Sequence, residues 1–168
     1  MSVELSVPSG NVGLEAAADG ISSALAELLG QHEPVQLRIE VRDLDEQWIG
    51  VVSHPSQVQV LRFDVPASPA GPSESHLNVT VADRTPLGIA VMLATAIVLA
   101  ERDEQMVVDD SALFGATEHH PSELRRRAGV RADGEAPERA AQSLCRRFGL
   151  AATASSATPD ARGSSTTT

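Results

Sequence analysis

The sequence predicts an α+β protein. We expect a two-layer sandwich whose mostly antiparallel sheet of four to six strands carries two main helices on one face, with small C-terminal helices. Residues 35–42 alternate between apolar and polar, the pattern of a strand with one buried face. Residues 14–28 and 86–100 have the apolar spacing and the length of helices. Short turns join the strand-like segments, which favours antiparallel neighbours but leaves the strand order open.

The chain begins with a weak strand and a well-marked helix. Val3 to Val7 alternate weakly, and Ser9 or Asn11 in the following turn can cap a helix. Gly30 suits the position just after the end of that helix. The helix over 14–28 should cover the sheet with one side only. Its apolar face consists of Leu14, Ala18, Ile21, Leu25 and Leu28.

Three more strands follow the alternating one. A turn at 43–46 leads to a strand at 48–52, and residues 57–65 and 77–81 continue the pattern. The apolar phase of 57–65 changes near Val60. A β-bulge there, or burial of the strand on both faces, would explain the change. The two apolar sets are Val58 with Val60, and Leu61 with Phe63 and Val65.

Residues 86–100 form the most apolar helix of the chain. Thr85 and Pro86 suit its N-cap and its first helical position. Fifteen residues at about 1.5 Å each span roughly 22 Å, less than the roughly 30 Å core of a bilayer, so we expect a buried helix and no membrane span. Because the helix is apolar nearly all round, something must cover its far side. The candidates are the helix at 14–28, the C-terminal helices and a second subunit, which would make a homodimer.

The elements predicted for the rest of the chain are shorter. A strand is predicted at 105–110, and short helices at 121–128 and 137–148. From residue 151 the chain consists mainly of Ala, Ser, Thr, Pro and Gly, which is typical of disorder. The predicted organisation is an α+β core domain over 1–110, a helical extension over 111–150 that packs on the core, and a disordered tail over 151–168.

Charge is distributed unevenly along the chain. The net charge is −10, but residues 1–120 hold 18 acids and 5 arginines (−13), and residues 121–168 hold 5 acids and 8 arginines (+3). An acidic body disfavours binding to nucleic acid or anionic membrane and suits a basic protein partner. The candidate partner-binding residues are Asp43, Asp45 and Glu46 in one acidic turn, and Arg125, Arg126 and Arg127 in the basic segment.

The basic segment allows two interpretations. Seven arginines between residues 125 and 147 could contact phosphates, yet acids are interleaved with them and Phe148 is the only aromatic nearby. We therefore favour docking of these helices on the acidic body of the same chain or of a second copy. The seven are Arg125, Arg126, Arg127, Arg131, Arg139, Arg146 and Arg147.

One cluster has metal-ligand chemistry. Asp109, Asp110, His119 and His120 supply carboxylates and imidazoles, so a metal-dependent enzyme is an alternative. However, neighbours on a strand point to opposite faces, and no HExxH or DxDxDG spacing is present. We expect instead that Asp110 ends a strand and that the histidines lead into the next helix.

No motif indicates catalysis. The sequence contains no GxSxG, P-loop or GxGxxG pattern, and the single cysteine, Cys145, has no evident base. We therefore predict no catalytic residue and no cofactor. The single cysteine and the absence of a basic and apolar leader favour a cytoplasmic protein.

The Ala-rich helix, the charged turn and Val107-Val108-Asp109-Asp110 together resemble the end of small bacterial α+β domains. These include immunity proteins of polymorphic toxin systems and actinobacterial domains. The resemblance covers about 25 residues and includes no signature residue, so it transfers no site. It implies a stoichiometric inhibitor that masks a toxin. The expected function is thus non-enzymatic: a protein-binding module, immunity-like or accessory, that captures a basic partner.

Overall fold

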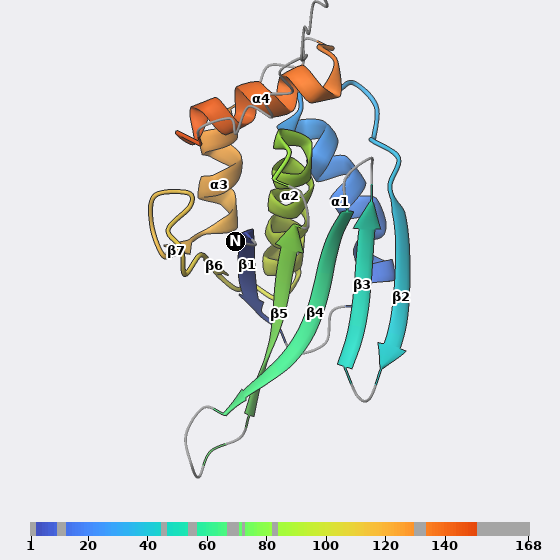
Figure 1. The fold of residues 1–168 in the computed structure, drawn as a ribbon, viewed down its shortest axis with the longest axis vertical. Coiled ribbons are helices and arrows are strands. Elements are labelled where there is room, and N and C mark those ends of the chain that lie inside the picture. The colour runs from blue at the N-terminus through green and yellow to red at the C-terminus, as the bar shows by residue number, and fades with distance from the viewer. Residues whose placement is uncertain are drawn as a thin grey trace, which may run out of the picture.

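The N-terminal strand lies inside the sheet, and the helices gather on one side of it (Figure 1). The computed structural model describes residues 3–9, 13–44, 47–53, 57–66, 71, 73–81, 84–129 and 134–150. In chain order the elements are β1 (Val3–Pro8), α1 (Leu14–Leu28), β2 (Arg38–Leu44), β3 (Gln47–Ser53), β4 (Gln57–Pro66), β5 (Ser73–Val81), α2 (Pro86–Arg102), β6 (Val107–Val108), β7 (Glu118–His119), α3 (Pro121–Ala128) and α4 (Pro137–Arg147).

The sheet is antiparallel, which confirms the predicted α+β class. Its order is β2-β3-β4-β5-β1-β6-β7, with five long strands and two strands of two residues at one edge. β1 is central because it pairs with β5 from Val3↔Val81 to Pro8↔His76, and with β6 at Ser6↔Val108. The chain thus returns to its first strand twice, after β4 and after α2.

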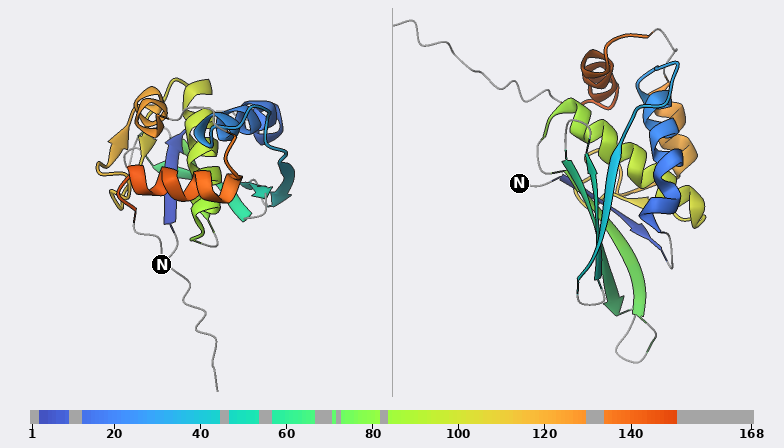
Figure 2. Two further views of the ribbon diagram at one scale, coloured as in Figure 1. Left: turned by 90° about the horizontal axis from the view of Figure 1, so that it is seen from above. Right: turned by 90° about the vertical axis from the view of Figure 1, so that its right-hand side faces the viewer.

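The helices form the second layer (Figure 2). Figure 1 shows α2 between α1 and α3, with α4 crossing the end of the helical layer. In the side view of Figure 2 the described helices lie on one side of the sheet, so the other face of the sheet carries none of them. We call that second face the open face. Burial follows the same division: Val3, Leu5 and Val7 of β1 are buried, whereas Glu4 is exposed.

The chain's own helices cover α2 on the side away from the sheet. α1, α3 and α4 all contact it, and Val91 and Val98 are 0% and 5% exposed. Gly20 of α1 allows close approach, because a Cβ at that position would lie 3.1 Å from Cγ1 of Val98. Of the three predicted covers, the two helical ones are therefore present, and no second subunit is needed to bury this helix.

Local signals explain the ends of several elements. The Thr85 hydroxyl accepts a hydrogen bond from Gly88 N (3.1 Å) and Pro86 occupies the first turn, as predicted for α2. α1 ends in a Schellman motif, in which Gly30 has φ 63° and its N–H donates to Glu27 O (3.2 Å). Gly129, with φ 43°, ends α3 in the same left-handed conformation.

Three local predictions were wrong. The N-cap of α1 is Gly13 without a side-chain hydrogen bond, because Ser9 continues from β1 and its hydroxyl donates to Asp103; Asn11 lies outside the described residues. The turn expected at 43–46 begins later, because Asp43 is still in β2 and pairs with Trp48. The bulge expected near Val60 is absent: β4 pairs with β5 in continuous register from Val58↔Val81 to Pro66↔Ser73.

The phase change in β4 has a different cause. Leu61 is 37% exposed, so the strand is not buried on both faces at that point, while Val58 and Val60 are fully buried under the helices. The apolar residue that follows Val60 therefore lies on the open face. None of the helices in the described part of the chain is long and apolar enough to cross a membrane.

Candidate functional site

The predicted metal cluster divides into two buried and two exposed residues. Asp109 and His119 are 0% and 2% exposed, whereas Asp110 and His120 are exposed. Asp109 and Asp110 thus point apart, as neighbours following a strand should. The Asp109 Oδ2 atom and the His119 Nε2 atom lie 3.9 Å apart.

Asp109 organises the loop between β6 and β7. Its Oδ2 atom accepts a hydrogen bond from Phe114 N (2.8 Å), and its Oδ1 atom accepts one from the Ser111 hydroxyl (3.0 Å). Its own N–H donates to Thr117 O (2.8 Å), and its carbonyl accepts from Ala112 N (2.9 Å). A buried carboxylate needs such donors, and here the loop provides them. Asp109 therefore closes the loop and holds Phe114 in the core.

The two histidines have separate structural contacts. His119 Nε2 donates to Ala116 O (2.9 Å), and its ring meets Phe114 edge-on at 6.4 Å between centroids. His120 caps α3, because its Nδ1 atom accepts from Ser122 N (3.3 Å) and from the Ser122 hydroxyl (2.7 Å). Within the described ranges, no three His, Cys, Asp or Glu residues are placed to hold a metal ion. The four candidates therefore do not form one site.

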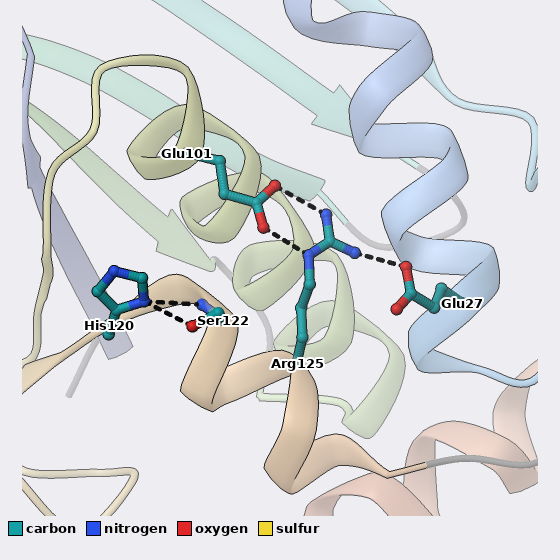
Figure 3. A network of polar contacts seen from close by, with 5 residues as sticks. All are labelled: Glu27, Glu101, His120, Ser122 and Arg125. Carbon is teal, nitrogen blue, oxygen red and sulfur yellow. Dashed lines mark hydrogen bonds and ion pairs between the residues drawn. The ribbon is translucent and has the colours of Figure 1, made fainter.

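Arg125 docks the basic segment on the acidic body of its own chain (Figure 3). From α3, its guanidinium donates to Glu101 of α2 through Nε (2.6 Å) and Nη2 (2.9 Å), and to Glu27 of α1 through Nη1 (2.6 Å). The hydrogen bonds to Glu101 raise the pKa of Arg125 above its usual value. The interpretation as intramolecular docking is confirmed for this residue.

The other candidate arginines differ in exposure. Arg127 lies over the Phe148 ring, 4.8 Å from its centroid, while Phe148 meets Phe114 edge-on at 5.1 Å. Arg126 is exposed. On α4, three arginines are exposed beside the exposed Glu138, and Arg131 lies outside the described residues. The three are Arg139, Arg146 and Arg147.

The acidic turn is only partly described. Asp43 belongs to β2, where its partner in register is Trp48. Asp45 and Glu46 lie outside the described residues.

The open face is the side of the sheet that the described helices leave uncovered (Figure 2). Leu61 of β4 is 37% exposed at its centre, and register pairs it with Asn78 of β5 and with Ile49 of β3. Asn78 Nδ2 donates to Glu4 Oε2 (3.1 Å), and its Oδ1 atom is buried with no hydrogen-bond partner among the described residues. The polar positions around this centre are Glu4, Ser6, Arg38, Glu40, Gln59, Glu74, His76 and Thr80.

This face is acidic. Its described charged positions are three carboxylates, Glu4, Glu40 and Glu74, against one guanidinium, Arg38, which pairs with Glu40 within β2. In the sequence, the phase change in β4 marked the exposed apolar position on this face.

Two other features, a groove and the buried Cys145, do not bring reactive side chains together among the described residues. A groove of about 540 Å³ runs along the loop before β2 and reaches Gly134 and Pro137, with Gln31 tying the loop to Glu135 O (2.6 Å). Cys145 is 3% exposed, and burial raises the pKa of its thiol. A protonated, buried thiol is a poor nucleophile.

Comparison of the chain with protein-family models, with curated proteins and with solved structures gives no match.

Proposed function

We propose that this chain is a non-enzymatic protein-binding module that captures a basic partner on its open face, as an immunity-like inhibitor or an accessory protein would. The observation that carries the proposal is the uncovered sheet face itself. It places the exposed Leu61 within a polar, acidic surrounding. As part of the same proposal we place the protein in the cytoplasm, because its one cysteine can form no internal disulfide.

Charge supports a basic partner. The net charge is −10, and Arg125 of the basic segment is already bound to Glu101 and Glu27 of the same chain. Glu4 and Glu74 on the open face are exposed. Opposite charges on a partner would speed its capture and would select against acidic competitors.

Leu61 would supply the apolar centre of such an interface. Stable interfaces combine a desolvated apolar centre with a polar rim that remains partly hydrated. On the open face, Leu61 pairs in register with Asn78 and Ile49, and the polar Gln59 lies two residues before it on the same strand. A flat sheet face also offers a rigid surface, which lowers the entropy cost of binding.

The test is affinity capture from the organism that encodes the chain, with matched variants. Leu61→Glu should abolish capture of the basic partner, and raised salt should release it from the wild type. Met106→Glu is the control, because Met106 is, among the residues whose side chains are described, the other exposed large apolar one (36%) and lies before β6. Capture that survives Leu61→Glu, or that salt does not weaken, would overturn the proposal.

A further inference from the structure

The two edges of the sheet are built differently. At one edge β7 has only two residues, Glu118–His119. At the other edge β2 has seven residues and pairs with β3 without interruption from Arg38↔Ser53 to Leu44↔Gln47. An edge strand presents backbone N–H and C=O groups on its outer side, and a long, regular one can template another strand.

β2 has only one of the usual protections of an edge strand. Proteins shorten such strands, bulge them, place proline or charged residues in them, or cover them, and β2 has the charged residues alone. Its sequence, Arg38–Leu44, contains no proline, its register has no bulge, and β3 is its only strand neighbour among the described residues. Figure 1 shows β2 at the margin of the sheet, and α1 contacts it from the helical layer.

The charges on β2 are self-complementary. Arg38 and Glu40 occupy alternate positions, so one face of the strand carries a positive side chain followed by a negative one. Arg38 and Glu40 already pair within the strand. An edge with one sign would repel a second copy. Here an antiparallel pair whose two-fold axis passes Ile39 places Arg38 of each copy opposite Glu40 of the other.

We propose that two copies of this chain associate through β2, antiparallel, to form one continuous sheet. A two-fold axis perpendicular to the sheet gives an isologous interface, the commonest arrangement in dimers. Both helical layers then lie on one side, and the two open faces join into one surface on the other. This association does not depend on any partner protein.

The test uses two charge variants that are incompatible with themselves and compatible with each other. Glu40→Arg makes the two positions both positive, and Arg38→Glu makes them both negative. In sedimentation velocity we expect each variant alone to dimerise about 10-fold more weakly than the wild type or worse. An equimolar mixture should restore a 1:1 dimer. Glu4→Arg on the central strand β1 is the control and should dimerise as the wild type does.

Two results would overturn the dimer. One is a wild type that stays monomeric over a concentration series reaching about 1 mM, where even a micromolar interface is filled. The other is variants that dimerise alone as well as the wild type. Hydrogen exchange on the wild type gives a reading that needs no variant: the amides of β2 should become protected as concentration rises, and unchanged exchange there would contradict the pairing. Loss of the dimer with intact partner capture would leave the proposed function standing.

Discussion

Arg125 in α3 holds Glu101 in α2 with two hydrogen bonds, of 2.6 and 2.9 Å, from Nε and Nη2 on one edge of its guanidinium. A third hydrogen bond, to Glu27 in α1, joins the remaining long helix. Two-point contacts between guanidinium and carboxylate are the stronger kind of ion pair, because geometry and charge act together. One side chain thus connects the helical extension to both main helices.

Removing this connection should lower stability. We expect Arg125→Ala to reduce the free energy of unfolding by about 1–2 kcal/mol, a modest value because Glu27 is well exposed and water screens its share. Arg125→Lys keeps the charge but loses the two-point geometry, so its free energy of unfolding should lie between those of the wild type and Arg125→Ala. Urea unfolding measures both. The neighbouring exposed Arg126→Ala is the control, and an Arg125→Ala protein as stable as that control would contradict the role.

Cys145 should make stability fall at alkaline pH. Its folded pKa is raised by burial, so its contribution is fully present below the unfolded pKa of about 8.5 and is lost as pH rises toward the folded value. The slope is at most about 1.4 kcal/mol per pH unit. The chain has no Tyr and no Lys, so few other groups titrate there. Unfolding measured from pH 7 to about pH 10.5 should show the slope, and Cys145→Ala should remove it. A wild-type curve that stays flat would refute this.

Asp109 should stabilise the loop without a metal. Asp109→Ala leaves the buried Phe114 N–H without its acceptor, and we expect a loss of about 2–3 kcal/mol. Adding Zn²⁺ or Mg²⁺ should not raise the melting temperature of the wild type. Differential scanning fluorimetry reads both effects. A metal-dependent rise that disappears in Asp109→Ala and His119→Ala would instead revive the metal site.

The buried face of α2 should reject polar groups. Val91 is 0% exposed between the sheet and the other helices, so Val91→Asn should cost about 3 kcal/mol by burying an amide without partners. Ile89→Asn, on the same helix at a partly buried position, is the matched comparison and should cost clearly less. Equal losses at the two positions, measured by urea unfolding, would show that burial does not decide the effect.

The sequence predicted most elements because their signals are local. Thr85 with Pro86 marked the start of α2, and Gly129 marked the end of α3, since each depends only on nearby backbone geometry. The central position of β1 could not be predicted, because Val3 pairs with Val81 across the length of the sheet. The same limit applies to Arg125, whose partners are 98 and 24 residues away. The charge distribution predicted that the basic segment would contact acidic residues of the body, but it could not select which residues.

The candidate sites show the same division. Asp109 and His119 were recognised by residue type, but their hydrogen bonds to Phe114 N and Ala116 O depend on how the loop folds back. The open face left a clearer trace, since the phase change after Val60 marked the point where Leu61 becomes exposed. Its explanation as a bulge was wrong because a phase change can also mean that the apolar residues have moved to the other face.

The most direct test of the open face as a binding surface is carboxyl footprinting of the chain with and without its captured partner. Glu4 and Glu74, both exposed on that face, should lose reactivity in the complex. Glu15 of α1 and Glu138 of α4, exposed on the helical layer, should react as in the free chain. Protection of Glu15 or Glu138 with unchanged Glu4 and Glu74 would place the partner on the helices and contradict the account.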